Sequence, residues 1–155
     1  MTDLSDLLSA EAVVSALGAA SKKSLFQQLG SLAARAYGLD AKLVGERLAE
    51  REKLGSTGFG GGIAIPHAKL DGLRHVAGAF VRLPQPVDFG AVDELPVDLV
   101  FTLLSPVGAG AEHLKALARV SRTLRDRGFA AKLRGAGSPD ALYALLTGVE
   151  ARDAA

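Results

Sequence analysis

The sequence predicts a single α/β domain, spanning residues 1–155, that is built on a central β-sheet. Two near-continuous apolar runs of strand length, Val76–Leu83 (VAGAFVRL) and Val97–Leu104 (VDLVFTLL), are typical of strands that are covered on both faces. Amphipathic helical patterns on either side of these runs provide the cover. With 155 residues, 48% of them hydrophobic, the chain has the length and apolar content of one domain with its own core.

Two helices are predicted before the first apolar run. Ser21 can cap a helix that runs to about Tyr37, and Gly38 supplies its stop. A second helix follows from Asp40. Its apolar positions recur at helical spacing so that Arg51 continues the buried stripe at the C-terminal end. We therefore expect the Arg51 guanidinium to point along the inner edge of the domain.

Two more helices are predicted after the second apolar run. An amphipathic pattern from about Ala111 to Arg127 begins its apolar stripe with His113, at the helix N-terminus. Ser138 followed by Pro139 predicts the cap and first turn of a last helix. No internal repeat or linker interrupts the chain, and only residues from about 150 are expected to fray.

The composition excludes several classes of function. Eighteen basic and seventeen acidic residues leave a formal net charge of +1, which disfavours nucleic acid as a partner. The absence of cysteine excludes disulfides, thiolate metal sites and cysteine nucleophiles. The N-terminus is acidic where a signal peptide is basic, and no uncharged apolar run reaches the roughly 18 residues of a membrane span. We expect a cytoplasmic protein that is not inserted in a membrane.

The segment Arg51–His67 (REKLGSTGFGGGIAIPH) carries the main functional signal. A proline ends the short strand expected at Gly62–Ile65 and places His67 just past the strand end. The preceding glycines let backbone N–H groups approach an anion closely, and Ser56 and Thr57 add hydroxyl donors. This combination of groups suits a phosphoryl group.

His67 is the candidate nucleophile, because a neutral imidazole with an ordinary pKa of ~6.5 can accept a phosphoryl group at cytosolic pH. His113, at a helix N-terminus, can hydrogen-bond the phosphoryl oxygens, and Arg51 can neutralise their charge. Histidine-to-histidine transfer needs no metal at the acceptor, so we expect neither a metal nor another cofactor. The phosphate-binding candidates are Arg51, Ser56, Thr57 and Gly58.

Each of these residues also has a purely structural interpretation. His67 can be an ordinary loop residue, and His113 can be a helix-start residue that packs its ring over the core. Arg51 can be a partner of the helix dipole that pairs with Glu50 or Glu52 in a solvated cluster. The glycine-rich segment can be a flexible turn.

Two other kinds of site are disfavoured by spacing. A hydrolytic metal site would combine the two histidines with a carboxylate such as Asp71 or Glu112, but no HExxH or comparable ligand spacing occurs. The patterns GxxxxGK[ST] and GxGxxG are also absent, which disfavours ATP and dinucleotides. The remaining histidine, His75, precedes a strand in a polar stretch and is assigned no role.

The stretch Gly55–His67 resembles the signature of the fructose/mannitol-type IIA domains of the bacterial phosphotransferase system, especially their nitrogen-regulatory branch (EIIA-Ntr). The family pattern of glycine and hydroxyl residues followed by GxGxAxPH is matched, and His67 has the phosphorylated position. Arg51 stands in REKLGSTG where these proteins carry an active-site arginine. The segment Glu112-His113-Leu114 is similar to the one that bears their second active-site histidine.

This resemblance implies an α/β fold with a mixed sheet of about five strands and helices on both faces. It also implies that His67 becomes a tele-phosphohistidine, and that His113 binds the phosphoryl group or assists its transfer. The donor would be a small HPr-like (NPr) histidine phosphocarrier, charged from phosphoenolpyruvate by an Enzyme I homologue. We expect this donor to dock on apolar surface around the His67 cleft, with Phe59 as a contact.

The resemblance leaves two outputs open. In the regulatory branch, the phosphorylation state of a free-standing IIA protein decides which target it binds, such as a potassium transporter or a sensor kinase. In the sugar-transport branch, the phosphoryl group passes to a separate sugar-specific IIB component. Because the chain contains neither a IIB nor a IIC component, regulation of nitrogen, carbon or potassium metabolism is the favoured expectation.

Overall fold

The computed structural model of the chain describes residues 3–148. Within this range the elements in chain order are β1 (Leu8–Val14), α1 (Lys22–Tyr37), α2 (Ala41–Lys53), β2 (Gly58–Gly60), β3 (Ile63–Ala64), β4 (His67–Leu70), β5 (Ala77–Val87), β6 (Val97–Pro106), α3 (Gly110–Arg125), α4 (Arg127–Gly135) and α5 (Pro139–Thr147). The tail expected to fray from about residue 150 lies outside the described residues. Among the described helices, none combines the length and the apolar character needed to cross a membrane.

The described strands form one mixed sheet at the centre of the domain, which confirms the predicted α/β class. The strand order is β1-β5-β6-β3-β2, and β4 also pairs with β6. β5 is antiparallel to β6 and parallel to β1, whereas β3 and β4 both run parallel to β6. The sheet has six strands where about five were expected, because β3 and β4 are successive short strands beside the same neighbour.

The break between β3 and β4 falls at Ile65 and Pro66. Proline has no N–H to donate to the ladder, but the Pro66 carbonyl accepts a hydrogen bond from the Leu103 N–H at 2.9 Å, so the chain stays beside β6. Parallel pairing resumes with His67 opposite Leu103. His67 is therefore the first residue of a strand. His67 lies just past the end of β3, as expected. The alternative in which His67 is an ordinary loop residue was wrong, because β6 extends far enough to pair with β4.

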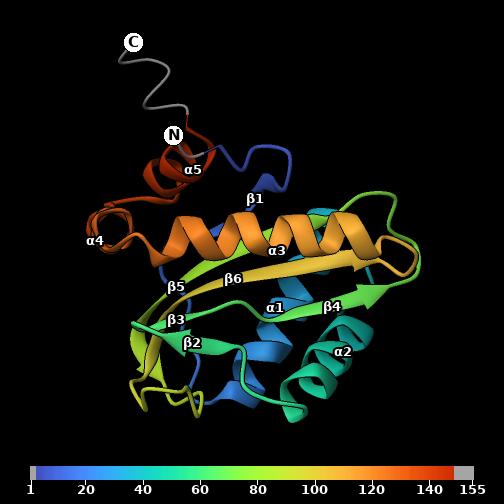
Figure 1. Cartoon of the computed structure of the whole chain (residues 1–155), viewed down its shortest axis with the longest axis horizontal. Helices are drawn as coiled ribbons and strands as arrows, with labels where there is room; N and C mark the ends of the chain where they lie inside the picture. Colours follow the sequence, from blue (N-terminus) through green and yellow to red (C-terminus); the bar gives the residue numbers. More distant parts are fainter. Residues whose placement is uncertain (1–2, 149–155) are drawn as a thin grey trace.

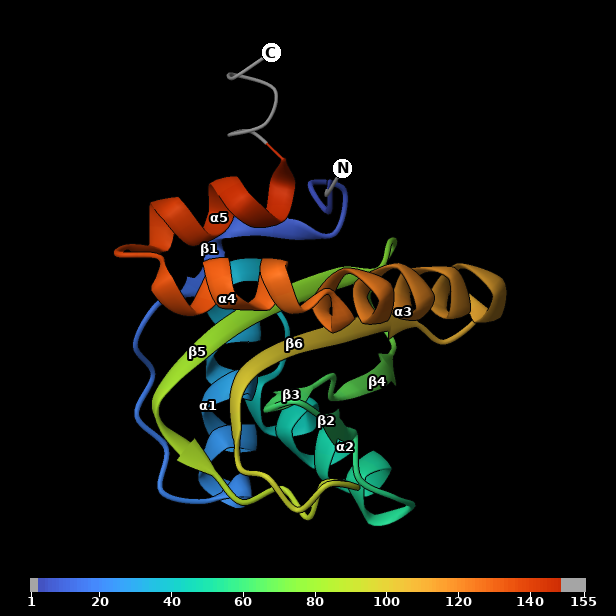
Figure 2. The same ribbon diagram turned by 60° about the vertical axis from the view of Figure 1, so that its left-hand side comes forward.

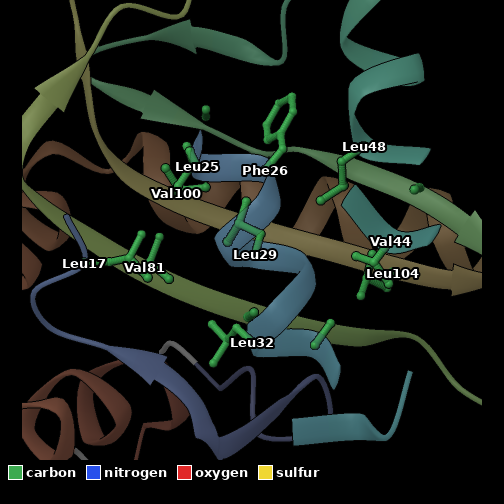
Figure 3. Packing of buried hydrophobic residues seen from close by; sticks show 14 of the residues in the cluster. Leu17, Leu25, Phe26, Leu29, Leu32, Val44, Leu48, Val81, Val100 and Leu104 are labelled. Atoms are coloured by element: carbon green, nitrogen blue, oxygen red, sulfur yellow. The ribbon is translucent and has the colours of Figure 1, made fainter. Parts of the chain in front are cut away.

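Helices cover both faces of the sheet, as expected. α1 and α2 lie on one face, and α3, α4 and α5 lie on the other (Figures 1 and 2). Two separate clusters of buried apolar side chains fill the two interfaces. Figure 3 shows the cluster beneath α1 and α2, which includes Leu17, Leu25, Phe26, Leu29, Leu32, Val44, Leu48, Val81, Val100 and Leu104.

The helix boundaries follow the predicted caps. Ser21 accepts the Ser24 N–H at 3.1 Å, and Gly38 ends α1 in the left-handed conformation with φ 69°. The side chain of Asp40 likewise caps α2. α1 and α2 approach so closely that Gly30 faces the carbonyl oxygen of Ala41 where a side chain would collide. This contact fixes the direction of α2, whose last turn reaches the functional site.

Four elements were not predicted from the sequence, namely α4 and the strands β1, β2 and β4. The helix expected over residues 111–127 ends as α3 at Arg125, because Asp126 adopts an extended conformation with ψ 111°. The Asp126 carboxylate then accepts the Phe129 N–H at 3.0 Å and starts a separate helix, α4. The strand β1 lies at the edge of the sheet, and its sequence LSAEAVV shows no clean alternation. The strands β2 and β4 are only three and four residues long.

Candidate functional site

The candidate site is an open cleft lined by residues of α2, β4 and α3. At this end of the sheet β4 lies between α2 and the start of α3 (Figures 1 and 2). The volume of the cleft is about 470 Å³. The cleft brings together three of the residues singled out in the sequence, namely Arg51, His67 and His113. Its lining residues are Arg47, Glu50, Arg51, Leu54, His67, Ala68, Lys69 and His113.

The two ring nitrogens of His67 have different partners. Nδ1 lies 2.9 Å from the carbonyl oxygen of Ile65, two residues earlier in the chain. Since a carbonyl can only accept, Nδ1 carries the proton and donates it. Nε2 accepts a hydrogen bond from Nε of Arg51 at 3.2 Å, which requires a lone pair on that nitrogen. The ring is therefore held as the neutral tautomer whose nucleophilic nitrogen is Nε2.

The surroundings of His67 also favour the neutral ring. Burial lowers its pKa, the carbonyl of Ile65 raises it in part, and the positive charge of Arg51 lowers it again. Glu52 makes a smaller contribution that raises it, and the net result is a pKa below the ordinary value. At neutral pH the lone pair on Nε2 is consequently available for reaction.

Arg51 reaches the cleft from the last turn of α2. Besides its contact with His67, it donates from Nη1 to the carbonyl oxygen of Gly55 at 2.8 Å, so two of its nitrogens are held in place. The interpretation in which Arg51 pairs with Glu50 or Glu52 in a solvated cluster is wrong. Glu50 is exposed and pairs with Arg47 at 3.9 Å, and Glu52 is only 9% exposed and pairs with Lys22. Arg51 is positioned as a cation beside the reactive nitrogen.

His113 lies in the first turn of α3 and is only 7% exposed. Its ring centroid is 5.3 Å from that of His67, with 49° between the ring planes. Burial lowers its pKa, and the nearby His67 and Lys69 lower it further, so this ring is also neutral at neutral pH. The ring packs against the protein, as its structural interpretation proposed, and it also lines the cleft.

A contact that sequence reasoning missed orients His113. Nδ1 of His113 lies 2.6 Å from Oγ of Ser105. Ser105 belongs to β6 and has no exposed surface. The two residues are eight positions apart and meet only because α3 folds back over β6, so no local sequence signal reveals the pair.

Glu52 is a second residue that sequence reasoning missed. Its carboxylate accepts the Thr57 N–H at 3.0 Å and the Thr57 hydroxyl at 2.6 Å, and it pairs with Lys22 of α1 at 2.8 Å. Burial raises the pKa of Glu52, but hydrogen bonds from Lys22 and Thr57 lower it to below the ordinary value. This ionised carboxylate anchors the start of the glycine-rich segment to the end of α2.

Three of the predicted phosphate-binding residues are not brought to the cleft. The Ser56 hydroxyl donates to the carbonyl oxygen of Phe89 at 2.9 Å, and its oxygen accepts the Gly58 N–H at 3.1 Å. The Thr57 hydroxyl is directed to Glu52. None of the three lines the cleft of His67. In this structure their polar groups fold the loop itself, whereas Arg51 is the phosphate-binding candidate that reaches the histidines.

Phe59 also lies away from the cleft. Its ring is half-buried under α3, with the Arg125 guanidinium 5.0 Å from its centroid. Arg125 follows His113 by twelve residues on the same helix, which corresponds to about 18 Å along the axis. The exposed apolar side chains next to the histidines are instead Leu54, which is 85% exposed, and Leu114, which is 65% exposed.

The metal-site alternative has no ligand set in the part of the chain that the structure describes. Residues 3–148 contain no group of three histidine, aspartate or glutamate side chains arranged to hold a metal ion. Glu112 lines a different cavity together with His75 and Arg119, not the cleft that His113 shares with His67.

Fold and site together define an α/β domain in which two neutral histidines and an arginine share one open cleft at the end of a mixed sheet. Residues 6–149 match the family described as "Phosphoenolpyruvate-dependent sugar phosphotransferase system, EIIA 2", and the chain belongs to this family. Proteins of this family are phosphotransfer components.

The relatives also identify the branch. The nitrogen regulatory protein of Bradyrhizobium diazoefficiens is 50% identical over 143 residues, which cover 92% of this chain and 94% of that protein. The crystal structure of the nitrogen regulatory protein IIA-Ntr from Neisseria meningitidis superposes with a TM-score of 0.86 at 39% identity, over 92% of this chain and 97% of that one. The fructose-specific EIIA component of Haloferax volcanii is 34% identical over 96% of this chain and 97% of that protein. The resemblance to the nitrogen-regulatory branch is confirmed.

Proposed function

We propose that the protein accepts a phosphoryl group on Nε2 of His67 from an HPr-like (NPr) histidine phosphocarrier, and that its phosphorylation state regulates nitrogen, carbon or potassium metabolism. The observation that carries this proposal is the environment of His67. Its Nδ1 proton is held by the Ile65 carbonyl, and its Nε2 lone pair faces Arg51 in an open cleft. The product is the tele-phosphohistidine expected from the sequence.

The proposed phosphoryl transfer needs no cofactor, because one N–P bond forms as another breaks. The Nε2 lone pair attacks the phosphorus of a donor phosphohistidine, so a new N–P bond forms as the donor N–P bond breaks, and the donor ring leaves with the bonding electron pair as a neutral imidazole. The donor keeps the proton on its other ring nitrogen, and His67 keeps its own on Nδ1. The Ile65 carbonyl, 2.9 Å away, stabilises the positive charge that develops on the His67 ring.

Arg51 and His113 are proposed to hold the arriving phosphoryl group. Arg51 already donates a hydrogen bond to Nε2 of His67, so its guanidinium lies beside the position that the phosphoryl oxygens would take. When the phosphoryl group arrives, Arg51 can donate to these oxygens instead. His113 faces the same space from the other side of the cleft, with its ring 5.3 Å from that of His67. A hydrogen bond from each side would stabilise the charge of the transferring group.

Regulation is favoured over sugar transport by the pattern of similarity. The chain is 50% identical to a nitrogen regulatory protein and 34% identical to a fructose-specific component. A phosphoryl group adds about 1.5 to 2 negative charges, by analogy with phosphoserine, to a cleft that holds Arg51 and Lys69. The change of local charge would alter docking of a target such as a potassium transporter or a sensor kinase. Passage of the group to a separate sugar-specific IIB component is the alternative, and a cytoplasmic location is part of either proposal.

The test is phosphorylation of the full chain followed by intact mass. The protein is mixed with phosphoenolpyruvate, Mg²⁺, Enzyme I and an HPr-like carrier that phosphorylates another IIA protein. The wild type and a His75→Ala control are expected to gain the mass of one acid-labile phosphoryl group, and His67→Ala is expected to gain none. Failure of the wild type to react with this active donor, or reaction of His67→Ala, would overturn the proposal.

A further inference from the structure

The contact between Ser105 and His113 bears on which ring nitrogen of His113 carries the proton, as well as on the direction of the ring. Oγ of Ser105 and Nδ1 of His113 are 2.6 Å apart, and both residues are buried. Either group can donate in such a pair: the hydroxyl to a bare Nδ1, or a protonated Nδ1 to the hydroxyl oxygen. The two arrangements leave opposite states on Nε2, which is the ring nitrogen that remains for the cleft.

The surroundings of Ser105 select one of the two arrangements. If Nδ1 donated, the serine hydroxyl proton would need another acceptor. Ser105 has no exposed surface, and among the described residues its hydroxyl contacts only His113. A buried hydroxyl proton without an acceptor is unfavourable, whereas donation to Nδ1 satisfies both groups. The hydroxyl therefore donates, and the neutral ring carries its proton on Nε2.

We propose that Ser105 is a positioning residue that holds His113 as the Nε2–H tautomer, so that His113 donates a hydrogen bond to the phosphoryl group on His67. This inference rests on the proposed function of the cleft. It gives the two rings complementary states: His67 offers a lone pair from Nε2, and His113 offers an N–H from Nε2. Two neutral rings of opposite tautomer provide a nucleophile and a hydrogen-bond donor without placing two positive charges 5.3 Å apart.

The reverse tautomer of His113 would weaken binding of the phosphoryl group. A bare Nε2 would direct a lone pair at anionic oxygens, and the ring would have to be protonated to bind them. Protonation is opposed by burial and by the neighbouring His67 and Lys69, which lower the pKa of His113. Because the Ser105 hydroxyl holds the neutral ring with its proton on Nε2, His113 can bind the phosphoryl oxygens without being protonated.

The tautomer is measured directly by long-range ¹H–¹⁵N correlation NMR on the full, unphosphorylated chain. Wild type is expected to show His113 protonated on Nε2. Ser105→Ala is expected to shift the ring toward the Nδ1–H form and to slow phosphorylation of His67 about tenfold or more. Ser105→Thr, which keeps a hydroxyl, is expected to restore both. Thr102→Val is the matched control, because Thr102 is a buried hydroxyl residue of the same strand whose Oγ1 has no hydrogen-bond partner.

Either of two results would overturn the inference. One is a wild-type His113 protonated on Nδ1, which needs no variant to fold. The other is a Ser105→Ala protein with unchanged tautomer and unchanged phosphorylation rate. A wild type that shows the Nε2–H tautomer but accepts no phosphoryl group would overturn the proposed function and leave the role of Ser105 in orienting the ring intact, so the two failures are distinguishable.

Discussion

Thr57 donates to the Glu52 carboxylate both from its N–H, at 3.0 and 3.3 Å from the two oxygens, and from its hydroxyl at 2.6 Å, at the point where α2 ends and the glycine-rich segment begins. Glu52 directly follows Arg51 on α2, and the two side chains lie on different sides of this helix. Arg51 faces the cleft, while Glu52 faces the interior and meets Lys22 of α1 at 2.8 Å. The end of α2 is thereby fixed from one side while the other side presents a cation to His67.

Replacing Glu52 by glutamine is expected to lower the free energy of unfolding by about 1–3 kcal/mol at pH 7, because Lys22 loses its counter-charge and the buried hydrogen bonds to Thr57 weaken. The difference in the free energy of unfolding between the wild type and Glu52→Gln should also depend on pH. The folded-state pKa of Glu52 is below its ordinary value, so its ionic stabilisation is present above the unfolded pKa of about 4.3 and is lost as the pH falls through the folded value. Urea denaturation of both proteins between pH 7 and pH 3 measures this.

Glu50→Gln is the control for the Glu52 variant, because Glu50 lies two positions earlier on the same helix, is exposed, and has its carboxylate 3.9 Å from the Arg47 guanidinium. It is expected to change the free energy of unfolding by no more than about 0.5 kcal/mol. A gap between wild type and Glu52→Gln that stayed constant down to pH 3 would show that the charge of Glu52 contributes nothing to stability.

Replacing Arg51 by lysine is expected to slow phosphorylation of His67 about tenfold while leaving the fold intact. Lysine keeps the positive charge but cannot donate from two fixed nitrogens to both His67 and the Gly55 carbonyl, as the planar guanidinium does. The rate of phosphoryl uptake from a saturating donor is the measurement, with Arg35→Lys, at an exposed position in the last turn of α1, as control. Equal rates for Arg51→Lys and the wild type would mean that charge alone, not the geometry of the arginine, is what the cleft requires.

His67 and His113 are both expected to titrate below the ordinary histidine value of about 6.5, because burial lowers the pKa of each. The unfolded chain then takes up these protons first, so both rings make the folded state less stable as the pH falls below about 6.5. Phosphorylation should stay constant from about pH 8 to 6.5 and decline only below the folded values. A histidine-detected NMR titration gives both midpoints, and a midpoint above 6.5 for either ring would contradict the neutral cleft.

Replacing Leu54 by serine is expected to raise the KM for the phosphorylated donor about three- to tenfold with little change in kcat, because Leu54 is an exposed apolar side chain on the lining of the cleft. Val92→Ser is matched in exposure, at 87% against 85%, and Val92 does not line the cleft. Steady-state phosphorylation with varied donor separates the two constants. If both variants raised KM equally, donor docking at the rim of the cleft would be excluded.

Local signals in the sequence were sufficient for most of the fold. The helix caps at Ser21 and Ser138, the start of the second helix at Asp40 and the two long apolar strands were predicted correctly, because each depends on residues within a few positions of one another. β1 was missed because it pairs on one side only, with β5, and its burial does not alternate. The start of α4 at Asp126 was missed because a continuous amphipathic pattern concealed a cap.

The sequence predicted which residues meet in the candidate site, but it did not predict the contacts that position them. The predicted helix ends and the family resemblance singled out Arg51, His67 and His113, and the structure places all three in one cleft. The roles of Glu52 and Ser105 depend on contacts between α2 and the loop and between α3 and β6, which sequence spacing does not encode. The hydroxyls expected to bind phosphate failed to reach the cleft for the same reason, since nearby carbonyl and carboxylate oxygens already accept their protons.

The parallel pairing of β4 with β6 connects both histidines to the same strand, β6. His67 sits opposite Leu103 in the ladder, and two residues further along β6, Ser105 holds the ring of His113. Both rings are therefore tied to β6, His67 through the pairing of β4 and His113 through the Ser105 hydroxyl, although His113 itself belongs to α3. The two rings thus share one cleft in the chain alone, and under the proposed function we expect exchange with a carrier to be limited by the rate of encounter rather than by rearrangement of this protein.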